Sequence, residues 1–251
     1  VGSLDELKSL TKKSGNTYFV MRHGEAENNV GNILNGDATK VFHLTEKGTE
    51  QVRKSAAQLA GKGITRIVAS PFTRAQETAG IVAGVLKLPV ETDARISEVK
   101  FGDLEGKVLD DLLKERPLND DWHARALERG ESLTELTRRV GEFLYEIEGK
   151  YTNEVVLIVS HDKPIRMMQA VAEQSAHARG TGLSAGEFFV QNAEVRTLSF
   201  VPLPHNKDYE LDYHLPYIDR VQLEKDGAPL TRIPEVVDCW VESGLMPFAD
   251  S

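Results

Sequence analysis

The sequence is poor in cysteine and contains no long apolar run. Its 251 residues include a single cysteine, Cys239, which excludes an intramolecular disulfide framework and a cysteine-based metal cluster. No apolar stretch approaches the roughly 18 residues needed to span a bilayer. We therefore expect no membrane partner. Because the chain does without disulfides, a reducing, cytoplasmic compartment is the natural expectation.

The chain also lacks an excess of positive charge. Its net charge of −9 argues against non-specific binding to nucleic acid or to anionic membranes. A local cationic pocket can still bind a small anion, because short-range contacts override the global field. The composition, with 40% apolar and 27% charged residues, is that of an ordinary soluble protein. The length suits one large domain, or one domain with an appendage.

Apolar, β-branched runs alternate with amphipathic segments along the chain. We expect strands at residues 17–21, 65–69, 88–92, 154–160 and 194–201, and helices at 44–63, 70–86 and 132–147. Two weaker helices are expected over 107–129. Ser132 with Glu135 forms a capping-box pattern, and Ser70 and Asp162 are candidate N-caps. This alternation predicts an α/β fold with a mostly parallel sheet, followed by an irregular C-terminal extension.

Basic side chains follow three of the predicted strands. Arg22 and His23 come after the first strand, Arg74 lies in the first turn of the helix after the second, and His161 follows strand 154–160. Ligands of open α/β sheets bind outside the carboxyl ends of the strands, so we expect these side chains to meet. The cluster would repel itself unless it held an anion, and a phosphoryl group fits two guanidinium groups and an imidazole. Glu98, on a nearby loop, is a candidate acid for the leaving oxygen.

Each of these residues, taken singly, also has an ordinary structural interpretation as a loop histidine, a surface ion pair or a solvated carboxylate. Their joint placement favours a functional site. A metal site built from His23, His161 and a carboxylate is disfavoured, because adjacent arginines would repel a cation and the usual zinc spacings are missing. We assign no role to Asp103 or Glu105. The remaining histidines show no partner pattern: His43, His123, His177, His205 and His214.

Several motifs together resemble the histidine phosphatase superfamily, in the branch shared with phosphoglycerate mutases. They are "RHGEAENN", "HLTEKGTEQ", "SPFTRAQET", "SEVKFGDLEG", "GESLTELTRRV", "VLIVSHDKPIR" and "NAEVRTLSF", and they cover about residues 16–201. The resemblance implies a three-layer α/β/α sandwich that needs no metal or other cofactor. It also implies a phosphohistidine intermediate, which water hydrolyses.

The resemblance assigns roles residue by residue. The phosphorylated histidine maps to His23 and the proton donor to Glu98. The residues that bind the phosphoryl oxygens map to Arg22, Arg74 and His161, and those that line the substrate side map to Asn28 and Asn35.

The chain departs from the family pattern at two positions. Asp162 follows His161 where glycine is more common, so it could bind a neighbouring arginine, lower the affinity for anions, or cap the next helix. Val99 follows Glu98 where mutases usually have arginine. We therefore expect a phosphatase of the histidine acid phosphatase type that acts on a small phosphorylated substrate. The alternatives are a phosphoglycerate mutase-type phosphotransferase and a non-catalytic, phosphate-binding regulatory module.

The end of the chain carries a second resemblance. Residues 211–251, and above all "RIPEVVDCWVESGLMPFA", are similar to a segment of isoleucyl-tRNA synthetases. The synthetase signatures HIGH and KMSKS do not occur in the sequence. We expect a lead-in at 1–15, a phosphatase-like domain at 16–201, and an extension at 202–251 that belongs to such a synthetase. The partners would then include the rest of that chain and, through it, ATP and tRNA. The alternative is an extension specific to this family.

The extension also carries aromatic side chains that need apolar contacts. They are Tyr209, Tyr213, Tyr217, Trp240 and Phe248. Two arrangements would bury them. The extension can pack on its own domain, or it can exchange with a second copy in a homodimer.

Overall fold

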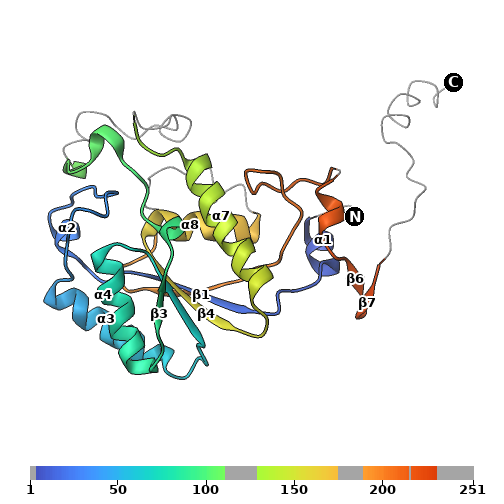
Figure 1. Cartoon of the computed structure of the whole chain (residues 1–251), viewed down its shortest axis with the longest axis horizontal. Coiled ribbons are helices and arrows are strands. Elements are labelled where there is room, and N and C mark those ends of the chain that lie inside the picture. The colour runs from blue at the N-terminus through green and yellow to red at the C-terminus, as the bar shows by residue number, and fades with distance from the viewer. Residues whose placement is uncertain (1–3, 111–128, 175–188, 215, 231–251) are drawn as a thin grey trace.

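A five-stranded sheet forms the centre of the molecule. The structure is a computed structural model that describes residues 4–110, 129–174, 189–214 and 216–230. The strands are β1 (Thr17–Arg22), β2 (Arg66–Ala69), β3 (Val90–Thr92), β4 (Val155–Ser160) and β5 (Val195–Leu198), in the order β3–β2–β4–β1–β5. Strands β1 to β4 run parallel and β5 runs antiparallel to β1. The expected mostly parallel sheet is thereby confirmed (Figure 1).

Helices cover both faces of this sheet, which gives three layers. Helices α3 (Glu46–Leu59) and α4 (Thr73–Leu86) cover one face, and α7 (Leu133–Lys150) and α8 (Asp162–Glu173) cover the other (Figure 1). Strand β4 shows why: Val156 and Ile158 pack in the core with α7 and α8, whereas Leu157 and Val159 pack in the core with α3 and α4. A continuous apolar run is what a strand covered on both faces requires.

Shorter elements complete the described chain. They are α1 (Leu4–Leu10), α2 (Glu27–Val30), η1 (Ala94–Ile96), η2 (Gly102–Leu104), η3 (Ile218–Arg220), β6 (Glu224–Lys225) and β7 (Ala228–Pro229). The two weaker helices expected over 107–129 fall mostly outside the described residues. No helix in the described part of the chain is long and apolar enough to cross a membrane.

The helix caps agree with the sequence at one predicted position and differ at two. The capping box of Ser132 and Glu135 is present. The N-cap of α4 is Phe72 rather than Ser70, and the Ser70 hydroxyl is hydrogen-bonded to His161. The N-cap of α8 is His161, and Asp162 is already the first helical residue.

The three site-bearing strands end at nearly the same level. Arg22 is paired in register with Ser160, and Ala69 with Val159. One residue further, the His23 N–H donates to the Ser160 carbonyl over 3.0 Å. Residues 22–23, 70 and 161 therefore leave the sheet together at its carboxyl edge.

The segment after β5 packs on helix α7. Tyr145 on α7 forms ring contacts with Phe200, His205 and Tyr209, with centroids 5.1, 4.2 and 5.4 Å apart. A Cβ on Gly141 would lie 2.3 Å from Tyr209 Cγ, so the tyrosine occupies the space that the glycine leaves. Tyr209 thus makes the apolar contacts expected of it. Tyr213 is exposed, and Trp240 and Phe248 lie outside the described residues.

The two ends of the described chain run side by side. Thr11, just after α1, forms an antiparallel bridge with Leu223, and the Lys12 N–H donates to the Gln222 carbonyl over 2.9 Å. Helix α1 precedes β1, so this pairing lies near the amino ends of the parallel strands. Figure 1 shows α1, β6 and β7 together at one end of the molecule and α2 to α4 at the other.

Candidate active site

Four basic side chains from separate segments meet at the carboxyl edge of the sheet. Arg22 and His23 come from the end of β1, Arg74 from the first turn of α4, and His161 from the start of α8. The imidazole rings of His23 and His161 lie edge to face, with centroids 5.1 Å apart. All four residues are buried. The structure therefore brings together the basic residues that the sequence placed at this edge.

His23 is held in one tautomer. Its Nδ1 lies 2.7 Å from the Gly24 carbonyl oxygen, and a ring nitrogen facing an acceptor must carry the proton. The lone pair is therefore on Nε2, which accepts from Arg74 Nε over 3.2 Å. Burial, followed by the charges of Arg74 and Arg22, holds the pKa of His23 well below its ordinary value. The ring is neutral near pH 7 and has a nucleophilic nitrogen.

Arg74 links the two histidines to the loop at residue 35. Its Nη1 donates to Asn35 Oδ1 over 2.6 Å, and its Nη2 donates to the Asn35 carbonyl over 3.1 Å. Nη2 also lies 3.3 Å from His161 Nδ1. Burial lowers the pKa of Arg74 to about 10, so the side chain stays charged at neutral pH. Because this cation donates to both imidazoles, their lone pairs already face a positive charge, which disfavours the metal alternative.

His161 is fixed from its other side by Ser70. Since Arg74 can only donate, His161 Nδ1 is an acceptor and Nε2 carries the proton. That Nε2 lies 2.8 Å from Ser70 Oγ. Burial, followed by the charges of Arg74 and His23, keeps the pKa of His161 low. The sequence places Ser70 directly after a predicted strand and predicts it as a helix N-cap. The sequence does not predict its contact with His161.

Arg22 is only partly occupied by protein groups. Its Nη1 donates to the Val190 carbonyl over 2.7 Å, and its guanidinium lies 5.0 Å from the centre of the Phe189 ring. Its Nε is buried and has no hydrogen-bond partner among the described residues. The guanidinium is thus anchored at one end and retains a donor for a ligand.

Glu98 lies on the loop after η1 and is partly buried. Burial raises its pKa, while the charges of Lys163 and Arg74 act in the opposite sense. A raised pKa suits a carboxyl group that must donate a proton near neutral pH. Arg139 on α7 holds this loop: its Nη2 donates to the Glu98 carbonyl over 3.1 Å, and its Nε lies 2.6 Å from Glu131 Oε1. No pattern in the sequence marks Arg139 as a support for the loop that carries Glu98.

The two asparagines expected on the substrate side are both buried, but they differ in role. Asn35 accepts from Arg74 and donates to the Asp37 carbonyl over 3.0 Å, so it positions the arginine. Asn28 donates to the Ile33 carbonyl over 3.3 Å. Its Oδ1 is buried and has no hydrogen-bond partner in the described part of the chain.

Glu105, to which the sequence assigned no role, joins two loops of the site. Its carboxylate oxygens accept the Gly36 N–H over 3.1 and 2.9 Å and the Phe101 N–H over 3.0 Å. A Cβ on Gly36 would lie 2.0 Å from the Val99 carbonyl oxygen, so only glycine permits this close approach. The segment that holds Arg74 and the segment that carries Glu98 are thereby locked together.

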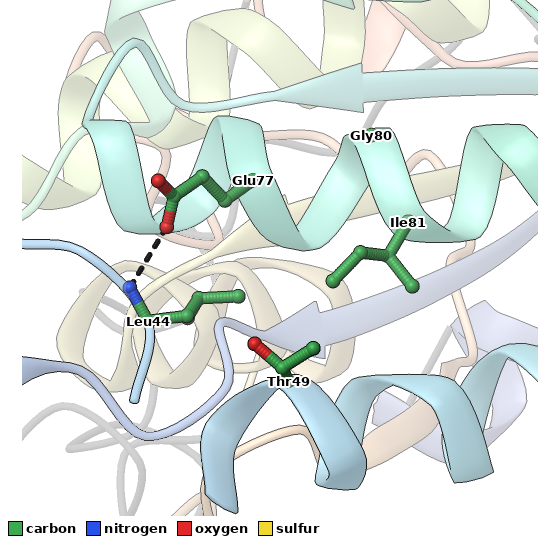
Figure 2. Close-up of a pocket in the computed structure, with 5 residues that line it drawn as sticks. All are labelled: Leu44, Thr49, Glu77, Gly80 and Ile81. Carbon is green, nitrogen blue, oxygen red and sulfur yellow. Dashed lines mark hydrogen bonds between the residues drawn. The ribbon is translucent and has the colours of Figure 1, made fainter. Parts of the chain in front are cut away.

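A hollow elsewhere on the surface does not belong to this site. It has a volume of about 420 Å³ and lies between α3 and α4, lined by Leu44, Thr49, Glu77, Gly80 and Ile81. Figure 2 shows Glu77 reaching across to the Leu44 N–H, 2.8 Å away.

Among the described residues, no group of three His, Cys, Asp or Glu side chains could hold a metal ion.

The geometry suits a tetrahedral anion next to a nucleophile. Two buried guanidinium groups supply charge-assisted donors, and a neutral imidazole offers a lone pair. The sequence profile of the histidine phosphatase superfamily, branch 1, matches residues 18–201. The chain belongs to the histidine phosphatase superfamily. Members of this superfamily act as phosphatases or mutases through a phosphohistidine, so the chain is an enzyme of that class.

Two curated relatives illustrate both activities. The adenosylcobalamin/alpha-ribazole phosphatase of Escherichia coli (strain K12) is 29% identical over 157 residues, which are 61% of this chain and 76% of the relative. The probable phosphoglycerate mutase GpmB of Yersinia pestis (strain Pestoides F) is 32% identical over 151 residues, which are 57% of this chain and 68% of the relative. These histidine phosphatase relatives leave the choice between hydrolysis and isomerisation open.

Two solved structures share the histidine phosphatase fold. Bacillus stearothermophilus YhfR superimposes with a TM-score of 0.65 and 24% identity, covering 89% of this chain and 98% of that one. The mycobacterial glucosyl-3-phosphoglycerate phosphatase in complex with VO3 has a TM-score of 0.62 and 23% identity, covering 72% of this chain and 91% of that one. At this identity the likeness concerns the fold.

Proposed function

We propose that this enzyme hydrolyses small phosphomonoesters through a phosphohistidine on His23. One observation carries the proposal: His23 Nε2 bears a lone pair and lies 3.2 Å from Arg74 Nε, so a phosphoryl group drawn to the arginine arrives next to the nucleophile. A bound dianion would compete with the imidazole nitrogens for the donors of Arg74. Nε2 would then be released to attack.

The reaction has two displacement steps at phosphorus. In the first, His23 Nε2 forms a bond to phosphorus as the ester P–O bond breaks, and Glu98 gives its proton to the leaving oxygen. Arg22, Arg74 and His161 hold the non-bridging oxygens. In the second, Glu98 takes a proton from water, the water oxygen bonds to phosphorus, and the N–P bond breaks. Inorganic phosphate leaves and Glu98 is protonated again.

The neighbourhood of the acid favours hydrolysis over isomerisation. Val99 follows Glu98 and is 2% exposed, with its N–H bonded to Glu98 Oε1 over 3.0 Å. A buried apolar side chain at this position offers no charge to a phosphoglycerate carboxylate. A direct test compares inorganic phosphate release with phosphoglycerate isomerisation in the same preparation. Isomerisation faster than release would favour the mutase.

Replacement of the nucleophile tests the chemistry. His23→Ala should abolish turnover of an aryl phosphate and prevent acid-labile labelling by a radioactive phosphoryl donor, while circular dichroism shows an intact fold. His214→Ala is the matched control, because the His214 side chain is 91% exposed and pairs with Asp212 in the segment after β5. Near-wild-type turnover by His23→Ala would refute the assignment. Phosphate binding by the wild type without turnover would support the regulatory module.

We also propose that the domain is inserted in an isoleucyl-tRNA synthetase chain, with residues 202–251 as the return segment. The sequence similarity of that segment is the first support. The second is the pairing of Thr11 with Leu223, because an inserted domain needs its entry and exit close together. The full-length gene product is the test. Flanking HIGH and KMSKS blocks, with aminoacylation of tRNA from ATP, are expected, and a chain without them would contradict the proposal.

A further inference from the structure

Asp162 directly follows His161, one of the residues proposed to bind the phosphoryl oxygens. Its carboxylate begins α8 and its side chain is 12% exposed. Oδ1 accepts the Val190 N–H over 2.9 Å, and Oδ2 lies 3.6 Å from Arg166 Nη1. A carboxylate placed beside an anion site should weaken anion binding through like-charge repulsion. The ion pair with Arg166 offsets part of this repulsion.

The residue whose N–H is bonded to Asp162 also binds Arg22 through its carbonyl. The Val190 N–H is bonded to Asp162, and the carbonyl of Val190 accepts Arg22 Nη1 over 2.7 Å. Phe189, one residue earlier, lies against the guanidinium with its ring centre 5.0 Å away. Val190 itself is 0% exposed, so this residue is fixed in the core. A continuous path of two hydrogen bonds thus runs from Asp162 to Arg22.

This path fixes the orientation of the planar guanidinium group of Arg22. A guanidinium held at Nη1 and stacked on a ring can turn little, so the direction of its remaining N–H groups is set. Nε of Arg22 is buried without a partner among the described residues. Phosphoryl sites need such donors placed within about 0.5 Å. Burial lowers the pKa of Arg22, and the charge of Asp162 acts in the opposite sense.

We propose that Asp162 is a positioning residue that aims Arg22 at the phosphoryl group through the backbone of Val190. The inference rests on the proposed function, in which Arg22 binds the phosphoryl oxygens. It assigns Asp162 to the geometry of the anion site. Neither helix capping nor a separate binding site is needed to explain the residue.

Two substitutions separate the hydrogen bond from the charge. Asp162→Ala removes both, whereas Asp162→Asn keeps an Oδ1 acceptor for the Val190 N–H and removes only the charge. We expect Asp162→Ala to weaken binding of inorganic phosphate, measured by calorimetry, and to raise KM for an aryl phosphate by about tenfold. kcat should change less than KM. In Asp162→Asn, the affinity for inorganic phosphate and the KM for the aryl phosphate should both stay within about threefold of the wild-type values.

A double-mutant cycle tests whether the effect passes through Arg22. In an Arg22→Ala background, Asp162→Ala should cause no further loss of phosphate affinity. An equal loss in both backgrounds would overturn the inference, as would wild-type affinity in Asp162→Ala. If Asp162→Asn behaved like Asp162→Ala, the charge rather than the hydrogen bond would be responsible, and the inference would also fall.

The experiment also separates this inference from the proposed function. If Asp162→Ala does not fold, Asp162→Glu replaces it, because the longer side chain keeps the charge but displaces the Val190 contact, and the same loss of affinity is expected. Phosphate binding is measured independently of turnover. A wild type that binds phosphate but releases none from esters would refute only the proposed hydrolysis. A wild type that hydrolyses esters, with Asp162→Ala unchanged, would refute only the role of Asp162.

Discussion

Acidification should destabilise this protein through its two buried active-site histidines. Burial and the arginine charges lower the pKa of both His23 and His161 in the folded state. In the unfolded chain the pKa of both histidines is about 6.5. The unfolded state therefore binds more protons than the folded state as the pH falls below that value. The stability contribution is present above the unfolded pKa and is lost as the pH falls toward the folded pKa.

The size of this loss follows from proton linkage. A histidine that stays neutral when folded lowers the free energy of unfolding by about 1.4 kcal/mol between about pH 8 and pH 5.5, and the pair by about 3 kcal/mol. Glu98 acts in the opposite sense. Its pKa is raised by burial, so its contribution is greatest below the unfolded value and is lost as the pH rises. On acidification, Glu98 therefore offsets part of the loss in the free energy of unfolding that the histidines cause.

A difference measurement isolates one histidine from these other groups. Urea unfolding of the wild type and of His161→Gln is followed in phosphate-free buffer at both pH values, with the slope m as a check on the unfolded state. Glutamine does not titrate, so the wild type should lose about 1.4 kcal/mol more than the variant on acidification. An equal loss in the two proteins would mean that His161 is charged or solvated when folded. The description of His161 as a neutral, tightly held side chain would then be wrong.

Two glycine substitutions test the close approaches in the fold, with Gly149→Ala as the unhindered control. Gly36→Ala would place a Cβ 2.0 Å from the Val99 carbonyl oxygen, so we expect a loss of about 2 kcal/mol or more in thermal or urea unfolding together with reduced turnover. Gly141→Ala would place a Cβ 2.3 Å from Tyr209 Cγ, so it should destabilise the protein by about 1–3 kcal/mol and expose the segment after β5 to limited proteolysis. Gly149→Ala, on the same helix as Gly141, meets nothing within 4 Å and should stabilise by up to about 1 kcal/mol. If either hindered variant matched the control, the corresponding contact would be refuted.

Much of the candidate site could be predicted because it depends on strand order along the chain. Arg22, His23 and His161 directly follow apolar runs, and parallel strands present their carboxyl ends at one edge. The contacts that support these residues could not be found in this way. Ser70 meets His161 across 91 positions of sequence, and Arg139 reaches the Glu98 carbonyl across 41. No local pattern marks a contact of that kind.

The amino-acid sequence alone determined the alternation of strands and helices, and with it the edge of the sheet at which the basic residues gather. The periodicity of apolar residues and the ends of strands are local properties, so they can be identified from the sequence alone. Only the tertiary structure decided which ring nitrogen of His23 carries the proton, which groups bind Arg74, and how Asp162 is linked to Arg22. These depend on ångström-scale contacts between residues distant in sequence, and packing alone sets such distances.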